Sequence, residues 1–122
     1  MAVSNISIAQ ISGANLIIDT TNGNTPVAVK GSSGIIHELE LDNSANGAAT
    51  YFKLFNVAAG SVVMGTTDPD MTILVPAATK ITMVFPDGLT FGTAIAMASV
   101  TGKAASSAVA PVSAFVVKMV YV

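Results

Sequence analysis

Several residue types are missing from this chain, and each absence excludes a class of function. The 122 residues include no cysteine, no tryptophan and no arginine, and they include a single histidine, His37. Without cysteine the chain can form no disulfide, no thiolate nucleophile and no cysteine-ligated zinc site. A histidine-based catalytic or metal site would have to rest on His37 alone, with carboxylates as its only partners.

Charge is also scarce. Charged residues make up 10% of the chain, whereas an average soluble domain has about 25%. The formal net charge is −2, and the five lysines stand far apart, so they form no basic patch of the kind that binds phosphates. We therefore expect no nucleic-acid binding. The lysines are Lys30, Lys53, Lys80, Lys103 and Lys118.

Long hydrophobic runs are absent too, although 52% of the residues are hydrophobic. The N-terminal stretch MAVSNISIAQIS has no basic segment before an apolar core, so we expect no secretory signal. The apolar runs are interrupted well before the ~20 residues that a membrane-spanning helix needs. These features predict a soluble chain with no membrane partner, folded as one domain over residues 1–122.

What the chain does contain is turn signals at near-regular spacing. Asn22-Gly23, Asn46-Gly47 and Asp87-Gly88 are dipeptides that favour tight turns. The runs between the turns are short and rich in valine, isoleucine, threonine and aromatics, which favours strands over helices. We count eight or nine such strands, and this number is typical of an all-β sandwich or a small barrel.

The clearest predicted strand is residues 33–42. Its alternation places Ile35, His37, Leu39 and Leu41 on one face and Ile36 and the acidic residues on the other. We expect it to pair with the next strand, 50–57. Strands 71–76 and 80–85 flank a connection of the length of a tight β link.

Candidate catalytic and metal sites are weak. His37 shares a strand face with leucine and isoleucine, which indicates a packed side chain. Glu38 and Glu40 are expected on one face of their strand, where they resemble a paired-carboxylate site but are more typical of a solvated surface. Asp68 and Asp70 could bind calcium or could cap a turn, and the sequence leaves this open. We expect no enzyme activity, no cofactor and no resident metal.

A family resemblance begins near Leu39 and extends to the end of the chain, about two thirds of its length. It consists of a strand ending in an asparagine-containing turn, a Tyr-x-Lys-Leu strand at Tyr51, a Gly-Thr-x-x-Pro-like step near Gly65, an apolar strand ending at Pro76 and a Pro-x-Gly-Leu-x-Phe segment at Pro86. In this order the elements resemble small virion proteins of tailed phages, among them capsid decoration (cement) proteins.

The resemblance implies a jelly-roll-like antiparallel β-sandwich on the outer surface of a capsid, made in the host cytoplasm and without catalytic residues. The implied partner is the major capsid protein, bound by a homo-oligomer that could be a dimer or a trimer. Within a virion, a tail, neck or fibre component remains an alternative. Outside it, the alternatives are a host-surface carbohydrate-binding module, which would depend on Tyr51 or Asp70, and an undetected enzyme, which would depend on His37 or Glu38.

Two segments are the predicted interface. Residues 1–12, with Ile6, Ile8 and Ile11 alternating, could be an arm that adds a strand to a neighbour or an ordinary first strand. The second segment follows an expected Asp87-Gly88 turn and forms a buried or interface strand with one small-residue face and one bulky face. Its interface candidates are Leu89, Phe91, Ile95, Ala96 and Met97.

Overall fold

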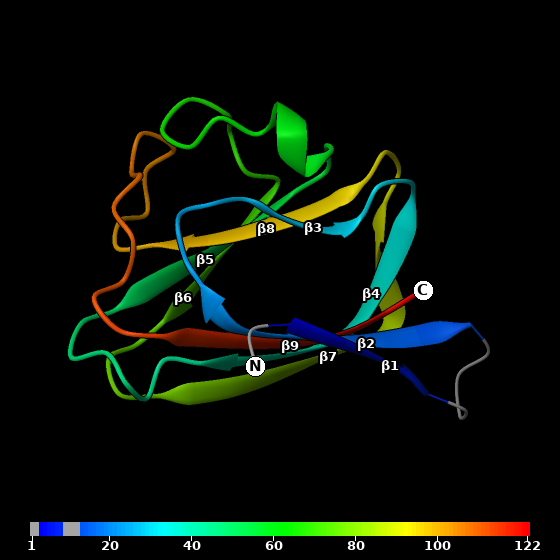
Figure 1. Ribbon diagram of the computed structural model, residues 1–122, viewed down its shortest axis with the longest axis horizontal. Helices are drawn as coiled ribbons and strands as arrows, with labels where there is room; N and C mark the ends of the chain where they lie inside the picture. Colours follow the sequence, from blue (N-terminus) through cyan, green and yellow to red (C-terminus); the bar gives the residue numbers. More distant parts are fainter. Residues whose placement is uncertain (1–2, 9–12) are drawn as a thin grey trace.

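The computed structural model describes the backbone of residues 3–8 and 13–122, and the side chains from residue 13 onward (Figure 1). Its regular structure is β-strand apart from one 3-10 turn, and none of the described residues forms a helix long and apolar enough to cross a membrane. The elements are β1 (Val3–Ile8), β2 (Ala14–Asn22), β3 (Val27–Lys30), β4 (Gly34–Asp42), β5 (Thr50–Phe55), η1 (Ala59–Ser61), β6 (Met71–Val75), β7 (Lys80–Phe91), β8 (Ile95–Val100) and β9 (Phe115–Tyr121).

The strands form two antiparallel sheets that face each other (Figure 1). One sheet has the order β1-β2-β9-β4-β7 and the other has the order β3-β8-β5-β6. The pairs β2·β9, β3·β8, β4·β7 and β5·β6 are nested within one another along the chain. This nesting is the topology of an eight-stranded jelly roll, to which β1 adds one strand at the β2 edge. The predicted all-β sandwich is confirmed.

The predicted pairing of β4 with β5 is wrong, because these strands lie in different sheets. The short link between β6 and β7 also joins strands of different sheets. Each of these connections crosses from one layer of the sandwich to the other. A short link fits such a crossing as well as it fits a hairpin, and the alternation of apolar residues does not encode which strand is the neighbour.

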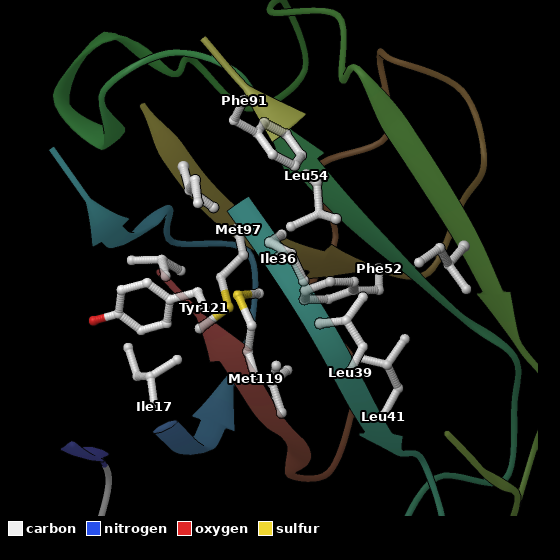
Figure 2. Close-up of a cluster of buried hydrophobic side chains, with 14 of the residues drawn as sticks. Ile17, Ile36, Leu39, Leu41, Phe52, Leu54, Phe91, Met97, Met119 and Tyr121 are labelled. Atoms are coloured by element: carbon white, nitrogen blue, oxygen red, sulfur yellow. The ribbon is translucent and has the colours of Figure 1, made fainter. Parts of the chain in front are cut away.

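The core lies between the two sheets, and both contribute to it (Figure 2). Phe52 of β5 and Phe115 of β9 stack across the layers with ring centroids 6.2 Å apart. The methionines Met97 and Met119 fill the space beside them, as expected for this flexible side chain. The other residues labelled in Figure 2 are Ile17, Ile36, Leu39, Leu41, Leu54, Phe91 and Tyr121.

The predicted Asp87-Gly88 turn is a bulge inside β7. Ile36 of β4 pairs with Leu89, whereas Glu38 pairs with Val84, so four residues of β7 lie opposite one residue of β4. Gly88 has a φ of 77°, and a Cβ at this position would overlap the Ile35 side chain. Glycine is therefore required here to let the strand bend without ending.

β4 has a bulge of its own at this point, since Ile36 pairs with Tyr121 and Glu38 with the adjacent Val120 of β9, and it corrects the predicted faces of β4. Leu39 and Leu41 point into the core as predicted, but their inward companion is Ile36, while Ile35 and His37 are only half-buried. The alternation therefore changes phase at the bulge. A single sequence read at a strict period of two cannot reveal such a shift.

A buried asparagine, Asn43, joins two connections at one end of the sandwich through its side-chain hydrogen bonds. Its amide nitrogen donates to the carbonyl oxygens of Ala48 at 3.0 Å, Val75 at 3.2 Å and Pro76 at 3.1 Å. Its side-chain oxygen accepts hydrogen bonds from Asn46 Nδ2 and Thr50 Oγ1. The turn after β4 and the link after β6 are thus joined through one side chain.

The Asn46 side chain extends this network to the segment before β9. Its oxygen accepts a hydrogen bond from the Ser113 backbone N–H at 2.7 Å, and its nitrogen donates to the carbonyl oxygen of Ser113 at 3.2 Å. Both asparagines are buried and have partners for their polar atoms, as a buried polar group requires.

Candidate functional site

The outer face of the four-stranded sheet is covered by two long connections, residues 56–70 and residues 101–114, and we call it the covered face (Figure 1). Beneath the first connection, Phe55, Ala96 and Ala98 are fully buried with Val62. The two connections also touch each other, since a Cβ at Gly65 would lie 3.6 Å from Ala108 Cβ. The small residues of β8 allow this cover to lie close to the sheet.

A buried lysine anchors the second connection. Lys53 lies on the covered face with 1% of its surface exposed, and its Nζ donates to the Ala104 carbonyl oxygen at 2.6 Å. Burial lowers the pKa of Lys53 because the charged ammonium loses contact with water. Lys53 therefore holds the connection 101–114 against the sheet through this hydrogen bond and is not a surface charge.

The outer face of the five-stranded sheet has no such cover, and we call it the open face. In Figure 1 no described segment lies on its far side. The strand register places Leu16, Val120, Glu38 and Val84 side by side across four strands, and Ile18, Lys118, Glu40 and Thr82 form the next row. The apolar members are half-buried or exposed, with Val84 at 64% exposure.

Charges divide the open face into apolar and polar strips. Glu40 lies between two lysines, with its Oε1 3.6 Å from Lys118 Nζ and 3.9 Å from Lys80 Nζ. Both pairs are partly exposed, so each contributes little to stability. Glu38 forms no ion pair within the described residues. Leu16, Glu38, Glu40, Lys118 and Val120 line a shallow depression of about 150 Å³.

Asp42 continues the acidic row along β4. Hydrogen bonds from the Ser44 side chain and backbone lower the pKa of its carboxyl group. The backbone bond, from the Ser44 N–H to Asp42 Oδ1, is 2.9 Å long. Together with Glu38 and Glu40, this residue gives the centre of the open face an acidic stripe.

The structure corrects part of the predicted interface. Phe91, Ile95, Ala96 and Met97 are at most 3% exposed within the single chain, so they belong to its interior rather than to a partner surface. Of the two readings of this segment, buried or interface, the buried one holds for these four residues. For Ile95, Ala96 and Met97 the reason is that β8 is central in its sheet and is covered on both sides. Phe91, at the end of β7, packs into the core between the sheets. Leu89 is half-buried at the rim of the core.

The N-terminal candidates have a different outcome. Ile6 and Ile8 lie on β1, which pairs with β2 of the same chain and places them opposite Leu16 and Ala14. In this structure the segment is thus a first strand. Ile11 lies outside the described residues.

The candidate chemical residues do not come together as a catalytic site. Glu38 and Glu40 share a sheet face as predicted, but that face is open. Asp70 Oδ2 accepts a 2.6 Å hydrogen bond from the Asn56 backbone N–H, which is the capping role of the two readings. Among the described residues no three histidine, cysteine or acidic side chains cluster closely enough to hold a metal ion.

The two residues named for carbohydrate binding lie apart. Tyr51 lines a depression on the covered face with Thr72, Leu74 and Lys103, whereas Asp70 lines another depression with Asn56 and Met71. They are at opposite ends of β6 and do not form one site.

Sequence reasoning missed the two features that distinguish the faces. The cover formed by the connections 56–70 and 101–114 is not predicted from the sequence. The first connection does carry a signal, because its apolar residues Val57, Val62 and Met64 pack against the sheet beneath it. Lys53 offered a signal, since it is the one charge in a strand otherwise made of buried residues and Tyr51. A comparison of the chain with known proteins finds no matching family model, curated protein or solved structure.

Proposed function

We propose that this chain is a non-enzymatic structural protein of a phage virion, a decoration protein that binds the major capsid protein on the outside of the head and braces it. The open face is the observation that carries the proposal. Partly exposed apolar side chains of β2 and β9 surround an unpaired carboxylate there, whereas Phe55, Ala96 and Ala98 on the outer face of the other sheet are buried. An apolar surface left uncovered beside charges is typical of a protein interface.

The chemistry of the open face fits a protein partner better than a small substrate. Its depression is shallow and holds about 150 Å³, and it is lined by side chains of a flat sheet rather than by converging donors. Pockets that bind small ligands have larger volumes, of about 300 to 1,000 Å³. A lysine or arginine of the capsid protein would find Glu38 free to accept it, flanked by apolar contacts from Leu16 and Val120.

The test is reconstitution on heads that lack this protein. Val120→Lys places a bulky cation at the centre of the open face, where it would compete with a lysine or arginine of the capsid protein for Glu38, and we expect binding to fall at least about tenfold, which corresponds to about 1.4 kcal/mol. Val112→Lys is the matched control, because Val112 is 97% exposed and lies in the connection before β9 rather than on a strand of the open face. Equal binding by both variants, or no binding by the wild type, would contradict the proposal.

Copy number separates the head from the rest of the virion. A decoration protein repeats over the shell, so quantitative mass spectrometry of the particles should find this chain in numbers comparable to the capsid protein. A few copies per particle would favour a tail, neck or fibre component instead.

A glycan-binding role is the alternative outside the virion, since jelly rolls also occur in lectins. The observation that favours it is the depression at Tyr51, where a half-buried aromatic ring lies beside Thr72 and Lys103. Glycan-array binding that is lost with Tyr51→Ala but kept with Val120→Lys would establish this role in place of decoration.

A further inference from the structure

The core of this sandwich is less well covered between the edge strands β6 and β7 than between the opposite edges of the two sheets. Six apolar side chains pack against its rim while remaining only partly buried, and five of them belong to β6 or β7. On the opposite side, only Val27 of β3 is in this condition among the described residues. The five at the β6 and β7 edges are Met71, Ile81, Met83, Phe85 and Leu89.

β6 is an edge strand without the usual protection. Edges of natural sheets carry charges, prolines or bulges that prevent pairing with another chain. The edge strand β7 has Lys80, Pro86, Asp87 and a bulge, and the edge strand β3 has Lys30 and a register shift. β6 reads MTILV, with no charge and no proline, and it pairs with β5 without a register shift.

The backbone of β6 presents hydrogen-bonding groups at this free edge. The Ser99 N–H of β8 donates to the Gly23 carbonyl oxygen, so it points away from Phe52, its opposite residue on β5. In antiparallel sheets successive residues alternate between the two neighbouring strands. The N–H and C=O groups of Phe52 therefore point to β6, and those of Thr72 and Leu74 point to the free edge.

We propose that β6 pairs antiparallel with β6 of a second copy of this chain, across a two-fold axis at Ile73. Residues opposite each other must point to the same face, so only every second register is allowed. The allowed register that uses all five residues places Thr72 opposite Leu74 of the second copy. In this register the N–H groups of Thr72 and Leu74 donate to each other's carbonyl oxygens, once in each direction.

The absence of charge on β6 is what favours a second copy as the occupant. At a two-fold axis each residue meets its own equivalents, so a charged edge would repel itself. The axis also brings the half-buried side chains of β7 toward those of the second copy, which continues the core across the interface. The single chain lacks a cover for these side chains, and its own symmetry mate supplies one.

The pairing has a geometric consequence for the rest of the molecule. A two-fold axis that relates antiparallel strands of one sheet is perpendicular to that sheet, so the open faces of both copies point in the same direction. The dimer would thus present a docking surface twice as wide on one side. Its use in bracing a capsid rests on the proposed function, whereas the dimer itself does not.

Analytical ultracentrifugation of the full chain tests the dimer. We expect the wild type to sediment as a dimer and Thr72→Pro to dissociate at least about 30-fold more readily, because two of the inter-copy hydrogen bonds are lost. Proline is tolerated on an edge strand when its nitrogen faces outward, so the variant should keep the far-ultraviolet circular dichroism of the wild type. Thr72→Val is the control, and it should remain a dimer.

Three outcomes would overturn the proposal: a wild type that is monomeric at its solubility limit, a Thr72→Pro variant that dimerises normally, or the unfolding of both Thr72→Pro and Leu74→Pro. The last result would mean that these N–H groups do not face the free edge. Failure of the dimer and failure of the proposed function are distinguishable. A monomer that binds heads contradicts only the dimer, and a dimer that ignores heads contradicts only the decoration role.

Discussion

The two outer faces of this sandwich consist of similar strands, but connections cover much of one face and leave the other exposed. On the covered face, Phe55 and Ala98 are fully buried beneath the connection that follows β5. On the open face, Leu16 and Val120 hold equivalent outward positions and remain partly exposed. An outward apolar residue in a strand therefore becomes core or surface according to the connections that cross it. The pattern of the strand itself does not decide between the two.

The largest expected loss of folding free energy comes from a substitution on the covered face. Ala96→Lys would place an ammonium group in a fully buried site lined by Phe55 and Val62, with no carboxylate beside it. We expect a loss of more than about 4 kcal/mol of folding free energy, which would leave little folded protein. Urea denaturation measures it. A stable variant that still decorates heads would mean that the face is not covered.

A smaller loss is expected where the ends of the two layers are joined. Asn43→Ala removes the donor for one buried and two partly buried carbonyl groups, and it removes the acceptor for Asn46 and Thr50. Unpartnered buried groups cost about 1–3 kcal/mol each, and relaxation toward water should limit the total to about 2–4 kcal/mol. Ala45→Ser, at an exposed position, is the control for a change in the same turn. Equal thermal stability of both variants would contradict the fastening role of Asn43.

The pH dependence of stability tests the anchor of the cover. Because burial lowers the folded-state pKa of Lys53, the unfolded chain binds more protons between that pKa and the ordinary value of 10.5. Stability should therefore rise as the pH increases through this window. The Lys53→Met variant should lack this component of the rise, as measured by denaturation curves at successive pH values. Parallel profiles for the wild type and the variant would show that Lys53 is hydrated in the folded state.

The smallest effect on stability is expected on the open face. Val120→Lys should change the free energy of unfolding by no more than about 0.5 kcal/mol, because the new ammonium group can reach water and lies near Glu38. The contrast with Ala96→Lys makes the comparison quantitative, since the two variants add the same charge to opposite outer faces. Thermal melts of both variants in one buffer measure it. Similar destabilisation of both would show that the open face is covered in the folded protein.

Much of the two-sheet architecture could be predicted from local patterns in the sequence. The alternation at Leu39 and Leu41 predicted their burial, and the short β-rich runs predicted a sandwich. Three features did not follow, because they depend on contacts distant in the sequence. The crossing of β4 to β5 depends on which strands pair, the bulge at Gly88 on its fit against Ile35, and the burial of Ala96 on a connection some 35 residues earlier. Among the predicted interface residues, Ala96 is buried for the last of these reasons, whereas Ile95 and Met97 are buried in the core between the sheets.

An electron cryomicroscopy reconstruction of the decorated head tests the central claim most directly, because it shows which side of the sandwich contacts the shell. We predict that the five-stranded sheet faces the capsid protein, with Val120 and Glu38 at the contact, while the connections 56–70 and 101–114 face the solvent. Density in which those connections contact the shell, or heads that carry no density for this chain, would contradict the account.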